Sequence, residues 1–201
     1  MRLFSREAPV RSPRDLGRMH PFVHASDALS RTFFELQGHK PPVLTVAQIF
    51  AALLPPRAIA PSAPVDGGPP LAPIPHVDMV FASSLAVSEL KWADLVDYVT
   101  PQLTAYGVGG IVMSAARFES LPPEARAILR RTAEGAGSLL SQRVRAADDL
   151  AFAKLRSDKK VVKLTEGERV EWATACRALR DRVRASSAHP DVVDLIVAAG
   201  Q

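Results

Sequence analysis

The sequence predicts an α/β domain with a largely parallel sheet, because short apolar runs alternate with segments of helical period along most of its 201 residues. A composition of 47% hydrophobic and 23% charged residues excludes a disordered or fibrous chain. No apolar stretch has the length that a bilayer requires. The 25 Lys and Arg residues are scattered among 21 Asp and Glu, so a net charge of +4 does not indicate a nucleic-acid partner.

Short runs rich in β-branched and aromatic residues, bounded by charges, proline or glycine, indicate the strands. They lie at 2–4, 22–24, 43–44, 77–82, 98–100, 109–114 and 161–164. In sheets flanked by helices, ligands usually bind where strands end and helices begin. Polar residues at those positions are therefore candidate ligand contacts.

Helices are expected between the strands, at 27–36, 46–54, 84–95, 123–156, 166–185 and in a short stretch that begins at Pro190. The expected capping residues are Ser26, Thr45 and Ser84, with capping boxes at Ser12–Asp15 and Thr165–Glu168. The helix over 123–156 carries an apolar stripe at three- and four-residue steps. Gly135 and Gly137 within it predict a bend.

Residues 55–75 interrupt this pattern with eight of the 17 prolines and two adjacent glycines. Proline removes backbone donors and fixes φ, so we expect a flexible insertion without regular structure. The predicted organisation is one α/β domain formed by 1–54 and 76–201, with 55–75 inserted into it. A docking site for a proline-recognition module is the alternative for this segment.

No arrangement of residues for catalysis stands out. The serines at 83, 84 and 88 lack a surrounding GxSxG motif and an evident His and acid partner. The glycines of 107–110 precede an expected strand, whereas a phosphate-binding loop follows a strand and opens a helix. We therefore expect no enzyme activity and no cofactor.

Metal binding is not expected either. His20, His24 and Asp27 have a proline among them and no further His or Cys at ligand spacing. The single cysteine, Cys176, cannot form an intramolecular disulfide and is expected to be a buried small hydrophobic residue.

What remains is a set of aromatic and polar residues at strand ends. Such residues enclose apolar surface and orient polar groups without making bonds, as a binding pocket requires. The candidate ligand-binding residues are Phe22, His24, Ser26, Asp27, Ser83, Ser84, Trp92 and Tyr106. The residues by themselves thus predict an α/β ligand-binding domain.

The order of several longer phrases resembles the DctP family, the substrate-binding receptors of TRAP transporters. The phrases are RLFSREAPVRSPRDL (2–16), PFVHASD (21–27), QGHKPPVLT (37–45), AQIFAALL (47–54), VDMVFASSLAVSELKWADLVDYVT (77–100), GGIVMSAARFESLPPEARAILRRTAE (109–134) and EWATACRALRDRV (171–183). The resemblance covers nearly the whole chain except 55–75.

This resemblance implies a lobe like that of the type II periplasmic-binding proteins, with a long C-terminal helix. It also implies that the first lobe is largely missing, since Met1 falls well inside the usual protein. The expected function is to capture a small solute in the periplasm and deliver it to the membrane permease subunits. The first fifteen residues show no signal-peptide pattern, so a genuine start at Met1 would place the protein in the cytoplasm.

The resemblance also bears on the solute. In most members an arginine at the position of Phe22 pairs with the solute carboxylate, a contact that phenylalanine cannot make. The resemblance thus leaves two expectations for the solute. It is an organic acid, as the family implies, or it belongs to a different class because Phe22 replaces the arginine.

The alternative function is a protein-interaction module derived from the receptor fold. In both cases an apolar surface is expected where the first lobe would pack, with self-association through it. We also expect the chain alone to bind no solute tighter than about 100 µM.

Overall fold

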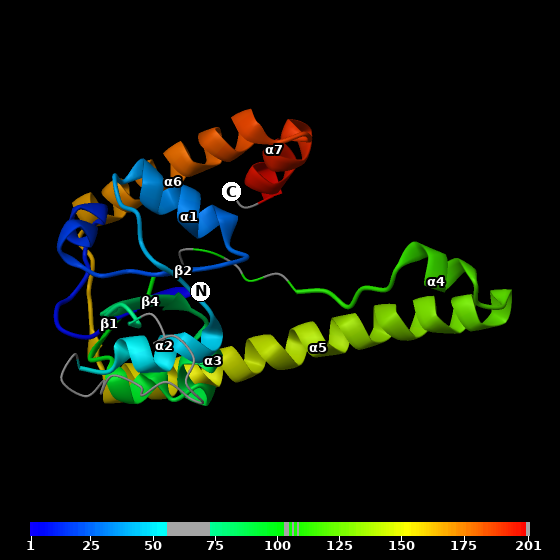
Figure 1. Ribbon diagram of the computed structural model, residues 1–201, viewed down its shortest axis with the longest axis horizontal. Helices are drawn as coiled ribbons and strands as arrows, with labels where there is room; N and C mark the ends of the chain where they lie inside the picture. The colour runs from blue at the N-terminus through cyan, green and yellow to red at the C-terminus, as the bar shows by residue number, and fades with distance from the viewer. Residues whose placement is uncertain (56–72, 103–104, 106, 108, 200–201) are drawn as a thin grey trace, which may run out of the picture.

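The computed structural model describes residues 1–55, 73–102, 105, 107 and 109–199 (Figure 1). Its first elements are β1 (Arg2–Ser5), η1 (Pro13–Arg18), β2 (Val23–His24), α1 (Ala28–Leu36), β3 (Val43–Leu44), α2 (Val46–Leu53) and β4 (Met79–Ala82). The remaining ones are α3 (Ser84–Glu89), η4 (Trp92–Leu95), β5 (Tyr98–Thr100), α4 (Ala115–Glu119), α5 (Pro123–Asp158), β6 (Lys160–Val161), α6 (Glu166–Ser186) and α7 (Pro190–Ala199). None of the described helices combines the length and the apolar character of a membrane span.

The main sheet has the strand order β4-β1-β5-β6. β1 runs antiparallel to both of its neighbours, with Leu3 opposite Phe81 on one side and Thr100 on the other. β5 and β6 are parallel, as are β2 and β3, which form a separate two-stranded sheet. The expectation of a largely parallel main sheet is therefore wrong at β1, because apolar alternation identifies a strand without specifying its direction.

Both faces of the main sheet are covered, because consecutive side chains of a strand point to opposite faces. Phe4 packs with Val80 and Val99 in a core shared with α2, α3, η4 and the end of α5. Leu3 and Met79 enter the core on the other face, against α1 and α6. The result is three layers, with the sheet between two layers of helices (Figure 1).

Most helix starts follow the expected signals. The capping boxes that begin at Ser12, Thr45 and Thr165 are present. Two other expected N-caps are wrong by one residue. Asp27 rather than Ser26 caps α1, and Ser83 rather than Ser84 caps α3.

The helix expected over 123–156 is confirmed as α5, and it runs without interruption through both internal glycines. Its C-terminal part packs on α3, while its N-terminal half projects away from the three layers (Figure 1). Leu155 of the apolar stripe is buried, whereas Leu140 and Val144 are exposed.

The strand expected over 109–114 is wrong. These residues belong to no strand, and Ile111 and Val112 are 85% and 91% exposed. The segment leads into α4, where the guanidinium of Arg130 lies over the ring of Phe118, 5.0 Å from its centroid. An apolar run without a neighbouring strand to complete its hydrogen bonds does not form a sheet.

Candidate ligand-binding site

A cavity of about 300 Å³ lies where β2, the end of β4 and the beginnings of α1, α2 and α3 meet. Aromatic and aliphatic side chains form most of its lining, with a few polar groups among them. This is the usual composition of a site for a small molecule. Each wall follows from how the chain passes from a strand into a helix.

The first wall comes from β2 and the start of α1, where Phe22, His24 and Asp27 line the cavity. The Asp27 carboxylate caps α1 because one oxygen accepts a bond from the Ser30 N–H (2.9 Å) and the other from the Ser30 hydroxyl (2.6 Å). The His24 ring Nδ1 lies 2.7 Å from the Ser26 hydroxyl oxygen. The side chains of Asp27 and His24 are thus held by local bonds.

The second wall comes from the end of β4 and the start of α3. Phe81, Ala82 and Ser83 follow one another along this wall. The Ser83 hydroxyl oxygen accepts a hydrogen bond from the Ala86 N–H at 3.0 Å, which begins α3. Ala86 also lines the cavity, so its small side chain leaves space for a ligand.

Trp92, at the start of η4, closes one side of the cavity. It is buried and belongs to the core below α2 and α3. The residue before it, Lys91, has a φ of 60° in the left-handed region, which only glycine adopts without cost. This turn separates α3 from η4 within the single helix expected over 84–95.

The N-terminal ends of three helices face the cavity. N-cap or first-turn residues of each helix line it, namely Asp27 and Ser30, Val46 and Ile49, and Ser83 and Ala86. Helix N-termini carry partial positive charge from unpaired N–H groups. Within the described part of the chain, no Lys or Arg lines the cavity, and its one carboxylate is that of Asp27.

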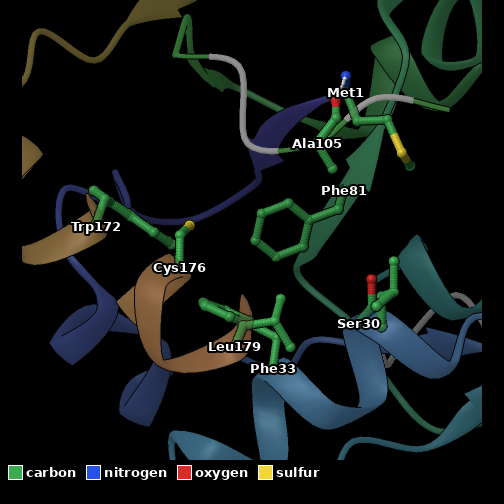
Figure 2. Close-up of a pocket in the computed structure, with 9 residues that line it drawn as sticks. Met1, Ser30, Phe33, Phe81, Ala105, Trp172, Cys176 and Leu179 are labelled. Carbon is green, nitrogen blue, oxygen red and sulfur yellow. Dashed lines mark hydrogen bonds between the residues drawn. The ribbon is translucent and has the colours of Figure 1, made fainter. Parts of the chain in front are cut away.

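A second, smaller cavity of about 110 Å³ adjoins the first and shares Met1, Ser30 and Phe81 with it. Phe81 points from β4 into the space between α1 and α6, toward Phe33 and Cys176 (Figure 2). The rings of Phe33 and Phe81 meet edge to face with centroids 6.4 Å apart. The smaller cavity is almost wholly apolar.

Cys176 on α6 lines this smaller cavity. Burial raises the pKa of its thiol above the ordinary value, against a smaller lowering by the charge of Arg180. A protonated thiol is a poor nucleophile. Cys176 is half-buried at the cavity wall, rather than fully buried as expected from the sequence.

Five of the eight predicted ligand-binding residues line the larger cavity, namely Phe22, His24, Asp27, Ser83 and Trp92. Ser26 is exposed and reaches the site only through its contact with His24. Ser84 is buried elsewhere, where its hydroxyl accepts a hydrogen bond from the Arg2 guanidinium at 3.0 Å. Tyr106 falls outside the described residues.

Sequence reasoning missed several lining residues, including Ser30, Val46, Phe81 and Ala86. Ser30 and Ala86 could have been predicted from the helix caps. The backbone N–H of each donates a hydrogen bond to the N-cap side chain of its helix. A residue at that position faces the same space as the cap. Phe81 was identifiable only as a strand residue.

Part of the chain matches a known protein family. The sequence model of the bacterial extracellular solute-binding proteins, family 7 (DctP), matches residues 83–186. That range begins at the cap of α3 and includes all of α5 and α6. No curated protein matches the chain.

Solved structures share the fold. A TRAP periplasmic solute-binding protein from Shewanella oneidensis with bound succinate has 17% identity and a TM-score of 0.73, over 100% of this chain and 60% of its own. One from Sulfitobacter sp. NAS-14.1 with bound β-D-galacturonate has 13% identity and a TM-score of 0.70, over 96% and 58%. One from Escherichia fergusonii in an open apo form has 20% identity and a TM-score of 0.68, over 97% and 58%. The chain therefore spans about 60% of the length of these structures.

Proposed function

The chain belongs to the bacterial extracellular solute-binding proteins of family 7, and from this premise we propose that it binds a small solute in the 300 Å³ cavity and delivers it to the membrane subunits of a TRAP transporter. The observation that carries the proposal is the gathering of five sequence-predicted residues around one cavity. Four of them come from two strand-to-helix passages that are about 60 positions apart in the sequence, and Trp92 comes from the start of η4. The family is one of receptors rather than enzymes, and the proposed role includes no catalysis.

The lining favours a neutral or weakly charged solute over a dicarboxylate. Phe22, Phe81 and Trp92 offer ring surfaces to an apolar part, and the Ser83 hydroxyl and His24 ring offer hydrogen bonds. A carboxylate solute would meet the carboxylate of Asp27 without a guanidinium to neutralise it. The partial positive charge at the starts of α1 and α3 does not offset this, because the Asp27 and Ser83 side chains already accept hydrogen bonds there. The related structures with bound succinate and galacturonate bind acids. We propose that this chain acts in the periplasm, as such receptors do. We also propose that Phe22 is the position at which its solute contacts differ from those of the acid-binding structures.

The test is a comparison of matched solutes that differ only in charge, such as succinamide against succinate and galactose against galacturonate. Thermal shifts at millimolar solute would detect even weak binding. The variant Trp172→Phe leaves Trp92 as the single tryptophan, so that its fluorescence reports the cavity directly. We expect neutral members of the pairs to raise the melting temperature and change Trp92 emission more than the acids do.

Variants at two half-exposed valines test whether the solute binds in this cavity. Val46 lines the cavity, whereas Val43 on β3 does not. Val46→Phe should weaken solute binding by filling space at the first turn of α2, while Val43→Phe should leave it unchanged. Equal binding by both variants would place the solute elsewhere, and stronger binding of the acids would overturn the proposed solute class.

A protein-interaction role is the second candidate, and one observation favours it. Ile111, Val112 and Met113 form an exposed apolar run in the segment that leads into α4. Exposed apolar patches commonly mark interaction sites. Capture of one defined protein partner, lost in an Ile111→Ser/Val112→Ser variant, together with no thermal shift by any solute, would support this role over the first.

A further inference from the structure

We propose that His20, His76 and Asp78 form a binding site for a divalent transition-metal ion. One ligand atom from each residue lies within 4.8 Å of the others. His24 and Asp27, the His and Asp nearest to His20 in the sequence on its C-terminal side, lack the spacing of metal ligands. The structure brings His20 to a different pair, because hydrogen bonds hold the segment before β2 against the segment before β4.

The contact between these two segments is fixed by backbone groups as well as by side chains. The His20 N–H donates to one Asp78 carboxylate oxygen at 2.7 Å, and the Asp78 N–H donates to the His20 carbonyl at 3.1 Å. The His20 ring Nδ1 lies 2.9 Å from the other carboxylate oxygen. Two of the three ligands are thus already in place relative to one another.

The third residue, His76, supplies an independent indication. Its ring Nδ1 is buried and, among the described residues, has no hydrogen-bond partner. Its ring is tilted against that of His20, with centroids 5.7 Å apart. A buried polar atom without a partner is costly, and a bound metal ion is one way to satisfy an imidazole nitrogen.

The donor set indicates the class of ion. Two imidazoles and one carboxylate suit Zn²⁺ and similar transition metals, whereas Ca²⁺ and Mg²⁺ prefer oxygen ligands alone. Zinc takes nitrogen and oxygen ligands at about 2.0 to 2.2 Å, so the three ligand atoms, which lie within 4.8 Å of one another, would move closer together around it. Asp78 has a side chain 5% exposed and stays fixed, while His20, at 64%, leaves the site open to solvent.

A bound ion would have a structural effect on the candidate ligand site. Phe22 follows His20 by two residues, and Phe81 follows Asp78 by three. These two phenylalanines belong to different walls of the 300 Å³ cavity. The metal would therefore join the two segments that lead into those walls and hold them at a fixed separation.

The experiment is a titration of the untagged full chain with Zn²⁺ by calorimetry, paired with thermal unfolding. We expect one Zn²⁺ per chain, a raised melting temperature, and no comparable effect of Ca²⁺ or Mg²⁺. Substitution with Co²⁺ should give the intense visible absorption of a four-coordinate site. His76→Ala removes a ring with no hydrogen bond at its buried nitrogen, so this variant should fold, and it should bind Zn²⁺ at least about tenfold more weakly, or about 1.4 kcal/mol.

Two further variants complete the test. His189→Ala, at an exposed position far along the chain, removes one histidine and should leave Zn²⁺ affinity unchanged. Asp78→Asn keeps an oxygen to accept the His20 N–H but lacks the charge, and should also weaken binding. No binding of Zn²⁺ by the wild-type chain, or equal affinity in His76→Ala and wild type, would overturn the site.

Discussion

Arg2 and Asp148 form an ion pair across 146 positions of the sequence, with 2.8 Å between the Arg2 Nη1 and the Asp148 Oδ2. The Arg2 side chain is 8% exposed, and its guanidinium also lies over the Phe152 ring at 3.7 Å from the centroid. The other Asp148 oxygen accepts a hydrogen bond from the Leu85 N–H at 2.9 Å. One carboxylate therefore ties the long helix α5 to both the central strand and the start of α3.

Replacing Asp148 with alanine should destabilise the fold strongly, because it leaves the Arg2 charge buried without a counter-charge. Loss of one partner of a buried pair costs about 3 kcal/mol or more in the free energy of unfolding. Urea unfolding of wild type and Asp148→Ala measures this difference in the free energy of unfolding. The neighbouring Asp149 is exposed, and Asp149→Ala should stay within about 0.5 kcal/mol of wild type. Similar losses in the two variants would contradict the role of the pair.

The cap of α1 can be tested with two adjacent residues. Asp27→Ala removes both bonds to Ser30 and should cost about 1 kcal/mol of stability. Ser26→Ala removes the residue that the sequence predicted as the cap and should cost much less. Chemical denaturation of both variants decides between them, and a larger loss in Ser26→Ala would show that the helix begins differently.

Stability should depend on the ionisation of Asp15. Burial alone raises the pKa of this carboxyl, but bonds from the backbone N–H groups of Arg11 and Ser12 and from Arg18 outweigh it, so the pKa lies below the ordinary value. A lowered folded-state pKa stabilises the fold above the unfolded-state pKa of about 4, and this stabilisation is lost as pH falls through the folded-state value. Asp15→Asn should therefore be less stable than wild type at neutral pH.

That difference should shrink as the pH is lowered below the folded-state pKa of Asp15. Denaturation curves for wild type and Asp15→Asn between neutral pH and the acid range would follow it. A gap of constant size at every pH would mean that the carboxylate charge does not contribute. Asp149→Asn serves as the control for general effects of removing a negative charge.

The insertion should be dispensable for folding. The prediction made for 55–75 falls mainly on residues 56–72, outside the described part of the chain. The chain on either side is held together, because the Val77 N–H donates to the Ala52 carbonyl at 2.9 Å. Replacing 56–72 with a short Gly/Ser turn should leave the melting temperature within a few degrees. A large drop in calorimetry would show that the segment contributes to the core.

Self-association should depend on the exposed apolar run at 111–113. Burying such side chains between two chains is favourable by about 25 cal/mol per Å². We expect concentration-dependent association in analytical ultracentrifugation, reduced in Ile111→Ser/Val112→Ser. A wild-type chain that stays monomeric at high concentration would refute this expectation.

Most local features of this protein were predictable from the sequence. The strand at 98–100 and the capping boxes at Ser12 and Thr165 were predictable, because each depends on neighbouring residues alone. The cavity was partly predictable for the same reason, since strand ends and helix caps are local signals. Five of its residues were found in this way.

Features that depend on distant segments were not predictable. The direction of β1 is set by partners nearly 80 positions or more away. His76 meets His20 only because two distant segments contact each other, and no spacing rule spans 56 positions. The apolar run of Ile111 and Val112 has the composition of a strand but no strand to pair with. Local pattern and long-range context disagree at that point.

The central position of β1 has a consequence for how the chain folds during synthesis. Among the described strands β1 is made first, yet its partners are at 79–82 and 98–100. At about 5 to 20 residues per second, both edges of β1 stay unpaired for roughly 5 to 20 seconds after it is made. An unpaired strand edge is a template for pairing with another chain. The nascent protein is thus most exposed to misassembly before Thr100 emerges, so slower translation or a late-acting chaperone would affect its yield more than its final stability.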